Sequence, residues 1–243
     1  MSDIRPYIDT ILMPRFRLTE EQCDKFACYY ELLVDWNSRM NLTAITDPEE
    51  VVVKHFYDSL LLTEDVSLLS GQELVDVGTG AGFPGIPLAI MVPGMHIDLL
   101  DSLRKRVGFL QTVIDTLALG ESVSAYHDRA ELFAKQSQRR DSYDWVTARA
   151  VARLPLLSEY CLPFLRPGGT FIACKGPNGA AELAEADYAL TCLAAQHRKT
   201  CHHELPDGEV RDILLIQKIA PTPKRFPRNP GAAAKAPLLK KKK

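Results

Sequence analysis

The stretch ELVDVGTGAGFPG, residues 73–85, decides how this chain folds. Its first five residues form a short, mostly apolar run, which is typical of a buried strand. The glycines that follow let the backbone turn sharply and pass close to a ligand before a helix begins. A strand, a glycine-rich turn and a helix in this order indicate a doubly wound, Rossmann-like α/β fold, in which ligands bind at the carboxyl ends of the strands.

Strand patterns alternate with helix patterns from this stretch to residue 219. We expect strands at residues 73–77, 96–101, 123–127, 143–148, 169–174, 199–204 and 210–219. We expect the later helices at residues 103–119, 130–136, 154–165 and 180–195. Short links between alternating strands and helices predict a mostly parallel sheet covered on both faces. Because no helix separates the last two strands, the seven-stranded sheet is expected to have an antiparallel edge strand.

The chain divides into three predicted parts. Residues 1–66 are expected to form an N-terminal helical extension, since Thr19 and Gln22 form a capping box and Asp47-Pro48 opens another helix. Residues 67–219 carry the α/β domain. Residues 220–243 are rich in Pro, Ala and Lys and have little to bury, so we expect a flexible basic tail.

The composition is that of an ordinary globular protein. Of 243 residues, 46% are hydrophobic and 25% are charged, which excludes a wholly disordered chain. No apolar run approaches the length that a bilayer requires and no signal-peptide pattern is present, so we expect a cytoplasmic protein without a membrane partner. The six cysteines include no C-x-x-C pair, so we expect reduced thiols and no metal site. A monomer is the default expectation.

The charges are unevenly distributed along the chain. The net charge is −2, yet residues 220–243 hold eight Lys or Arg and no acid, which leaves 21 basic against 31 acidic residues in the first 219. A cationic tail on an acidic body favours a polyanionic partner. The alternative is a solvated tail that only aids solubility.

The glycine turn favours S-adenosylmethionine over a dinucleotide. A G-x-G-x-x-G frame exists at Gly80, Gly82 and Gly85, but it begins two residues later than a dinucleotide fold requires. Pro84 removes a backbone donor for phosphate, and Asp76 on the strand repels phosphate. The pattern acid-x-Gly-x-Gly, which includes Gly78, suits a ligand with a cationic amine and no phosphate. A nicotinamide-dependent oxidoreductase is the alternative that this pattern disfavours.

Two later strand ends complete the predicted adenosyl site. Asp101 ends the second strand, where a carboxylate can accept hydrogen bonds from both ribose hydroxyls. Ala130 and Glu131 begin the helix after the third strand, where backbone N–H groups and the Glu131 side chain can read the edge of an adenine. Each acid taken alone is also a common turn or cap residue.

Several segments together resemble one protein family. They are residues 76–87 (DVGTGAGFPGIP), 101–107 (DSLRKRV), 147–150 (TARA), 175–176 (KG), 36–43, 55–59 (HFYDS) and the tail segment 222–231. The chain resembles the RsmG (GidB) family over nearly its whole length. The resemblance implies an S-adenosylmethionine-dependent methyltransferase that acts on N7 of a guanine in 16S ribosomal RNA of the small ribosomal subunit. It also implies that Gly78, Phe83, Ala130, Glu131 and Arg149 contact the cofactor.

Methyl transfer to guanine N7 needs no general base, because N7 carries a lone pair and no hydrogen. Positioning then supplies most of the rate, so no catalytic residue is assigned, and Arg149 and Lys175 are candidates for positioning. The Asn/Asp-Pro-Pro-aromatic motif of enzymes that methylate exocyclic amines is absent. Cys161 and Cys174 lack the Pro-Cys setting of 5-methylcytosine enzymes. A methyltransferase of this fold with another RNA target, or an RNA-binding protein that has lost catalysis, remains an alternative.

RNA contacts are expected from basic residues near the carboxyl ends of the strands. These are Arg104, Lys105, Arg106, Arg129, Arg153 and Lys175. Screening limits electrostatic reach to about 8 Å at physiological salt, so local positive charge matters more than the acidic body. Arg104 to Arg106 can instead be a solvated helix start, and Arg149 can bind either the methionine carboxylate or RNA. Naked RNA, an assembly intermediate and the intact subunit all stay open as substrates.

Overall fold

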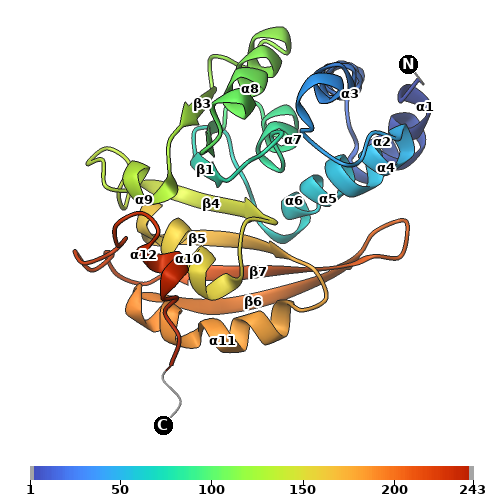
Figure 1. Cartoon of the computed structure of the whole chain (residues 1–243). Helices are drawn as coiled ribbons and strands as arrows, with labels where there is room; N and C mark the ends of the chain where they lie inside the picture. The colour runs from blue at the N-terminus through green and yellow to red at the C-terminus, as the bar shows by residue number, and fades with distance from the viewer. Residues whose placement is uncertain (1–2, 241–243) are drawn as a thin grey trace.

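A computed structural model describes residues 3–240 of the chain, which form a mostly parallel sheet covered by helices on both faces (Figure 1). Within these residues the sheet has seven strands in the order β3-β2-β1-β4-β5-β7-β6. Their bounds are Glu73–Val77 (β1), His96–Asp101 (β2), Val123–His127 (β3), Tyr143–Arg149 (β4), Leu165–Lys175 (β5), Ala195–Glu204 (β6) and Val210–Lys218 (β7). β1 to β5 pair in parallel, and β7 runs antiparallel to both β5 and β6. The predicted fold class is confirmed.

The strands send alternate side chains into two separate cores. Leu74 and Leu99 belong to one buried cluster, whereas their neighbours Val75 and Leu100 belong to the other. The first cluster lies under α7 (Gly85–Met91), α8 (Arg104–Thr116) and the N-terminal helices. The second lies under α9 (Ala130–Phe133), α10 (Leu154–Cys161) and α11 (Gly179–Cys192). A strand that is covered on both faces reads as a continuous apolar run, which is why the strands were recognisable in the sequence.

Two strands begin four residues earlier than the sequence predicted. β5 begins at Leu165, directly after a 3-10 turn at Leu162–Phe164, and β6 begins at Ala195. The extra residues of β5 include Arg166-Pro-Gly, and a Pro-Gly pair is typical of a turn and therefore hid the strand. The pairing of β4 with β5 shifts register between Tyr143 and Trp145, so this irregular segment still joins the sheet.

The N-terminal helices belong to the same core as one face of the sheet. They are α1 (Arg5–Tyr7), α2 (Met13–Phe16), α3 (Glu20–Met40), α4 (Pro48–Val51), α5 (Asp58–Leu60) and α6 (Leu62–Asp65), with π-helical turns at Ile8–Leu12 and Val52–Tyr57. The predicted capping box at Thr19 is confirmed. Phe56 and Tyr29 stack with ring centroids 5.5 Å apart, and Tyr29 lies 5.3 Å from Phe83 beside the glycine turn. The helical extension therefore supports the glycine turn directly.

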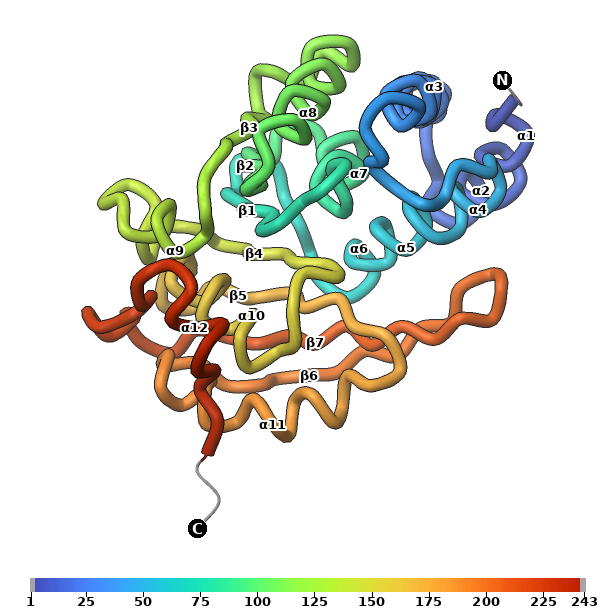
Figure 2. The backbone as a smooth tube through the Cα atoms, viewed as in Figure 1, coloured from blue at the N-terminus to red at the C-terminus, as the bar shows by residue number. Residues whose placement is uncertain are grey.

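Residues 222–236, here called the C-terminal arm, fold back onto the domain and pass α10 (Figure 2). Phe226 and Ala233 are buried in the second core, and the arm includes α12 (Ala232–Lys235). Lys218, which has no exposed side-chain area, anchors the start of the arm through Thr222. The composition predicted a tail with little to bury. The expectation of a flexible tail is therefore wrong for residues 222–236, which bury Phe226 and Ala233 and are held by polar anchors. So few anchors do not register in composition.

Among residues 3–240, no helix combines the length and the apolar character needed to cross a bilayer. The same residues contain no group of three or more His, Cys, Asp or Glu side chains placed to hold a metal ion.

Candidate functional site

Asp76 organises the glycine turn from beneath. Its side chain is completely buried, and Oδ2 accepts hydrogen bonds from Thr79 Oγ1 at 2.6 Å and Gly85 N at 2.9 Å. Oδ1 accepts a third hydrogen bond from Thr147 Oγ1 on β4 at 3.1 Å. The sequence predicted that Asp76 faces the ligand. The structure corrects this, because the carboxylate is consumed by the turn itself and acts on a ligand only through the shape of that turn.

The three glycines of the turn have different surroundings. Gly78, Gly80 and Gly82 all have positive φ angles of +71°, +63° and +100°, which side chains rarely adopt. At Gly80, a Cβ atom would meet nothing within 4 Å in the described structure, so the backbone here faces open space. At Gly82, a Cβ atom would lie 2.7 Å from Tyr29 Oη. Gly82 is therefore required by packing against α3, whereas Gly78 is the glycine of these three that lines a cavity in the described structure.

Asp101 also turns inward and away from a ligand. Its Oδ2 accepts a hydrogen bond from Gly80 N at 3.0 Å and its Oδ1 accepts one from Leu103 N at 2.8 Å. Arg106 Nη1 lies 3.3 Å from Oδ2, and the Asp101 residue is only 3% exposed. The prediction that Asp101 binds ribose hydroxyls is therefore not supported by its geometry. The next residue, Ser102, lines the cavity in its place.

Two cavities meet at the carboxyl ends of the parallel strands. The smaller has a volume of about 200 Å³ and lies across the ends of β1, β2 and β3, where Gly78, Ser102 and Glu131 line it. The larger has a volume of about 690 Å³ and lies at the ends of β4 and β5, facing the N-terminal helices. Val151 lines both cavities and forms the wall between them. Its Cγ2 would lie 2.6 Å from a Cβ atom on Gly78, so the wall rests directly on the glycine turn.

Ala130 and Glu131 lie where the sequence predicted, on the wall of the smaller cavity. The Glu131 residue is 2% exposed, and its Oε1 accepts hydrogen bonds from Arg129 Nη2 at 2.9 Å and from Gly231 N at 3.3 Å. Burial by itself raises the pKa of Glu131, but these hydrogen bonds outweigh burial and lower the pKa overall. Glu131 is therefore a carboxylate, and it faces the cavity as a hydrogen-bond acceptor.

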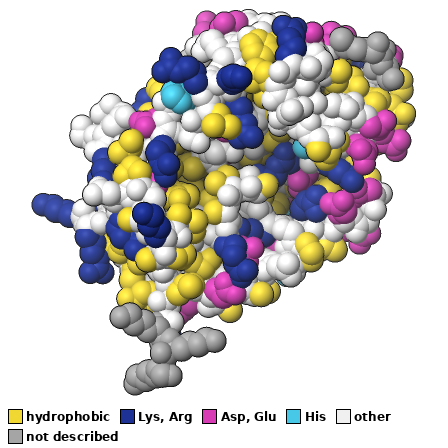
Figure 3. Space-filling model, viewed as in Figure 1, with side chains coloured by type: hydrophobic (Ala, Val, Ile, Leu, Met, Phe, Trp, Pro, Cys, Tyr) yellow, Lys and Arg dark blue, Asp and Glu magenta, His cyan; other side chains and the backbone are white. Residues whose placement is uncertain are grey.

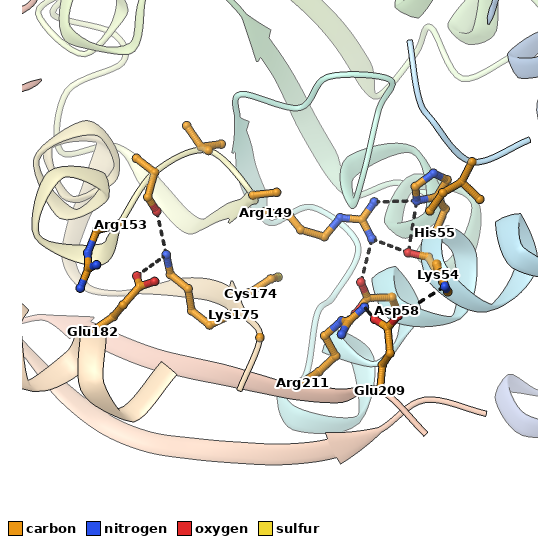
Figure 4. Close-up of a pocket in the computed structure, with 15 residues that line it drawn as sticks. Lys54, His55, Asp58, Arg149, Arg153, Cys174, Lys175, Glu182, Glu209 and Arg211 are labelled. Atoms are coloured by element: carbon orange, nitrogen blue, oxygen red, sulfur yellow. Dashed lines mark hydrogen bonds and ion pairs between the residues drawn. The ribbon is translucent and has the colours of Figure 1, made fainter. Parts of the chain in front are cut away.

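Arg149 connects β4 to the N-terminal helices across the larger cavity (Figure 4). Its Nη1 donates to Asp58 Oδ2 at 3.0 Å and to the Lys54 carbonyl oxygen at 3.1 Å. Its guanidinium carbon lies 5.2 Å from the centre of the Phe83 ring, which is a cation–π distance. Phe83 is 6% exposed, so its ring supports Arg149, whereas the resemblance implied a contact with the cofactor. Arg211 Nε donates to the other oxygen of Asp58 at 3.2 Å.

His55 is a neutral side chain beside Arg149. Its ring stacks on Phe83 with centroids 4.5 Å apart, and its Nε2 lies 2.9 Å from Thr43 Oγ1. Burial, together with the nearby positive charge of Arg149, lowers the pKa of His55 to about 3. The imidazole therefore adds no positive charge to the cavity at neutral pH.

Lys175 holds the chain segment that contains Val151. Its Nζ donates to the Ala152 carbonyl oxygen at 2.8 Å and pairs with Glu182 at 2.8 Å (Figure 4). Glu182 Oε2 in turn accepts a hydrogen bond from Leu154 N at 2.8 Å. The Lys175 side chain is only 10% exposed. This geometry suits the positioning role predicted for Lys175 better than the predicted contact with RNA.

The other predicted RNA-binding residues differ in their exposure to solvent and in whether an acidic side chain already pairs with them. Arg104 and Lys105 are exposed at the start of α8, whereas Arg106 is partly occupied by Asp101. Arg129 is half exposed and pairs with Glu131. Arg153 has a 65% exposed side chain and pairs with Glu185 at 2.6 Å. In Figure 3, Lys and Arg side chains are scattered over the face shown, among acidic, hydrophobic and uncharged groups.

Several residues that line the cavities were missed by the sequence analysis. They are Lys54, His55, Asp58, Ser102, Val151, Tyr160, Glu209 and Arg211. His55 and Asp58 stand in a segment that the analysis singled out without giving it a role. Their signal was a short polar stretch, which also includes Lys54 and Ser59, between apolar residues of one helical segment. Glu209 and Arg211 come from the β6–β7 hairpin, and no local pattern connects that hairpin with the end of β4.

The burial of the Asp76 carboxyl group leads to a testable expectation about how stability depends on pH. Burial raises the pKa of this carboxyl to about 6, although its three hydrogen bonds and Arg149 oppose the change. Between the ordinary value and about pH 6, the folded protein therefore binds more protons than the unfolded chain. The free energy of unfolding of the wild type, relative to Asp76→Asn, is expected to fall by roughly 2–3 kcal/mol as the pH rises from about 4 to about 6.

Urea unfolding of both proteins at several pH values measures this difference. Asp115→Asn, which changes an exposed acid on α8, is the matched control and should show no such trend. If the difference in the free energy of unfolding between the wild type and Asp76→Asn does not change with pH, the raised pKa of Asp76 is contradicted.

Comparison with known proteins adds independent findings. The family model described as rRNA small subunit methyltransferase G (GidB) matches residues 22–210. The chain is 45% identical to the ribosomal RNA small subunit methyltransferase G of Lachnoclostridium phytofermentans over 243 residues, which is the whole of both chains. It is 48% identical to the protein of the same name from Halalkalibacterium halodurans over 224 residues, which covers 92% of this chain and 94% of that protein.

Solved structures with little sequence similarity share the fold. A SAM-dependent methyltransferase from Aquifex aeolicus aligns with a TM-score of 0.55 at 17% identity, over 73% of this chain and 97% of that one. An O-methyltransferase from Bacillus cereus in complex with SAH aligns with a TM-score of 0.58 at 16% identity, over 88% of this chain and 97% of that one. The family that the glycine motif and its companion segments predicted is thus confirmed, and the chain belongs to the rRNA small subunit methyltransferase G (GidB) family.

Proposed function

We propose that this protein transfers a methyl group from S-adenosylmethionine to N7 of a guanine in 16S ribosomal RNA of the small ribosomal subunit. The observation that carries the proposal is the pair of cavities that meet at Val151, one behind the glycine turn and one lined by Arg149. A methyltransferase needs two such chambers, because the methyl donor and the target base must approach each other from opposite sides. The family places the activity on small-subunit RNA.

The smaller cavity fits S-adenosylmethionine. Gly78 leaves space where a side chain would collide with Val151, Ser102 offers a hydroxyl, and Glu131 offers a carboxylate acceptor. These residues, with the backbone of Ala130, would hold the adenosyl part of the cofactor. When bound, S-adenosylmethionine supplies an electrophilic methyl group on a positively charged sulfur.

The larger cavity suits a reaction that removes no proton. Asp58 is paired with Arg149 and Arg211, and Glu182 is paired with Lys175. His55 is neutral but is engaged by Thr43 and lies against Phe83. None of these groups is needed as a base for guanine N7, and their mutual contacts make the cavity rigid. Arg149 and Lys175 then serve as positioning residues, which agrees with a reaction in which orientation supplies most of the rate.

RNA reaches this face over scattered cations rather than over a uniformly basic surface. Arg104 and Lys105 are exposed and follow closely after Ser102, which lines the smaller cavity. The C-terminal arm exposes Lys224, Arg225 and Lys235. Because a phosphate contact needs only a cation within the screening length, such a track can bind RNA on an acidic protein. A ribosomal substrate implies a cytoplasmic enzyme, and a monomer is sufficient for the chemistry described.

Methyl transfer to ribosomal RNA tests the proposal. Purified protein is incubated with radiolabelled S-adenosylmethionine and, separately, naked 16S RNA and intact 30S subunits, and the methylated base is mapped. One guanine modified at N7 is the expected result. Modification of another RNA or of an exocyclic amine would overturn the guanine assignment. A thermal shift with NAD but not with S-adenosylmethionine would overturn the cofactor assignment.

Charge on the arm is expected to set part of the salt dependence of RNA binding. Removing the whole arm would disturb the core, because Phe226 is buried, so the exposed neighbours Lys224 and Arg225 are both replaced by Ala. The plot of log affinity against log salt should lose a slope of about 2, roughly one for each phosphate contact.

Filter binding to 16S RNA at several salt concentrations measures the slope. Arg198→Ala/Lys199→Ala, which removes an adjacent and exposed basic pair on β6, is the matched control. Equal slopes for the arm variant and the wild type would exclude the arm from the RNA track.

A further inference from the structure

The C-terminal arm meets the wall of the smaller cavity at two points. Gly231 N donates to Glu131 Oε1 at 3.3 Å. Arg228 forms a two-pronged ion pair with Glu159 on α10, with Nε at 2.9 Å from Oε1 and Nη2 at 2.5 Å from Oε2. Glu159 is 1% exposed and directly precedes Tyr160, which lines the cavity. The arm therefore contacts one wall residue and the neighbour of another.

The arrangement leaves one oxygen of Glu131 for a ligand. Arg129 and Gly231 both donate to Oε1, whereas Oε2 receives no side-chain donor from the described residues. A carboxylate only accepts hydrogen bonds, and the exocyclic amino group of adenine donates them. The orientation of Glu131 thus decides whether Oε2 is presented to an adenine, and the arm supplies one of the two hydrogen bonds that set this orientation.

Buried contacts fix the C-terminal arm to the domain. Arg228 N also donates to Glu159 Oε1 at 2.9 Å. The backbone and the side chain of Arg228 therefore both form hydrogen bonds with one buried carboxylate. Lys135 Nζ, just beyond α9, donates to Asn229 Oδ1 at 3.0 Å. Phe226 is 4% exposed and joins the core beneath α10. These contacts tie the arm to both α9 and α10, the two helices that form one side of the cavity.

We propose that the C-terminal arm completes the cofactor site, with Arg228 and Gly231 as positioning residues that hold Glu131 and Tyr160 for the adenine ring. The proposal rests on the proposed function, since it assumes that the smaller cavity binds S-adenosylmethionine. It gives the arm a role on its inner face that is separate from the exposed cations on its outer face. The arm then affects cofactor affinity even when no RNA is present.

Calorimetric titration of the full-length protein with S-adenosylmethionine, without RNA, tests the proposal. Arg228→Ala releases the arm but leaves Glu159 buried without its cation, which by itself can destabilise the fold. Glu159→Gln/Arg228→Ala removes that charge as well, so it releases the arm without stranding a buried carboxylate. The Kd is expected to rise about tenfold in both variants, the usual effect of losing a positioned charge-assisted hydrogen bond.

Four further measurements separate positioning from a general loss of structure. Arg228→Lys keeps the charge and should recover part of the affinity, and Arg198→Ala, an exposed change on β6 away from the arm, should bind the cofactor as the wild type does. Adenosine alone should lose affinity by a factor similar to that for the whole cofactor, because the affected contacts lie at the adenine end. Melting temperatures of the variants identify any that have failed to fold.

The outcomes are distinct. Wild-type Kd in a folded Glu159→Gln/Arg228→Ala protein would overturn the inference and leave the proposed function standing. A loss of affinity for S-adenosylmethionine with unchanged affinity for adenosine would also overturn it. A wild-type protein that binds no S-adenosylmethionine would overturn the proposed function and this inference together.

Discussion

Gly78→Asp is expected to abolish binding of S-adenosylmethionine, with a Kd at least 100-fold weaker than that of the wild type. Even a Cβ atom at this position would lie 2.6 Å from Val151 Cγ2. The φ angle of +71° is also one that most side chains rarely adopt, although Asp tolerates it better than most. A carboxylate pushed past Val151 would enter the smaller cavity and occupy space that the cofactor needs, and a 100-fold loss of affinity corresponds to roughly 2.8 kcal/mol.

Calorimetry on the folded variant measures this loss. Gly108→Ala is the matched control, because Gly108 lies on α8 with an ordinary φ and nothing in the described structure within 4 Å of a Cβ atom. That variant should bind normally. Retained affinity in Gly78→Asp would mean that the cofactor does not pass the glycine turn.

Arg149→Ala is expected to lower kcat for methyl transfer by about 100-fold or more, because a small misplacement of reacting groups costs that much. Arg149 joins β4 to Asp58, to the Lys54 carbonyl oxygen and to the face of Phe83, so its loss removes one side of the larger cavity. The smaller cavity does not include Arg149, so the Kd for S-adenosylmethionine should change much less than kcat. Single-turnover kinetics and calorimetry together measure the two effects.

Partial rescue distinguishes positioning from a loss of folding. Arg149→Lys keeps the charge but not the forked geometry and should recover only part of the rate. Arg166→Ala, which removes a 56% exposed arginine paired with Asp144, is the control and should react normally. A normal kcat in Arg149→Ala would remove Arg149 from the reaction. A loss confined to the Kd for the cofactor would assign it to the methionine end instead.

The sequence predicted the fold well because the strands are buried on both faces. Leu74 and Val75 enter different cores, so neither is exposed, and each strand reads as an apolar run. The divisions at residues 66 and 219 stay predictions. The helical extension shares a core with the sheet and therefore has no boundary that packing reveals.

The candidate site was predicted in outline but not in the direction of its side chains. Asp76 and Asp101 were correctly placed at the ends of β1 and β2, yet both turn toward backbone N–H groups of the glycine turn and the start of α8. Sequence spacing fixes where a strand ends, but it does not show which of the nearby donors a carboxylate will choose. Ser102 has no distinctive pattern of its own, because it directly follows Asp101, whose carboxylate is the stronger candidate ligand.

The larger cavity was harder to predict for a different reason. Arg149 was identified, but its partners Asp58 and Arg211 lie about 90 residues before it and about 60 after it along the chain. No periodic pattern relates such distant positions. Only the three-dimensional fold brings them to one place.

The stacking of Tyr29 and Phe56 beneath the glycine turn has a consequence for protein engineering. Tyr29 Oη donates to the Ala81 carbonyl oxygen, so a residue of the longest helix holds the loop that shapes the nucleoside chamber. The catalytic module could therefore not be fused to a new targeting domain at a boundary between the N-terminal helices and the sheet, because the two share one core. A chimeric protein would have to include the N-terminal helices, or supply another aromatic side chain that packs beneath the glycine turn as Tyr29 does.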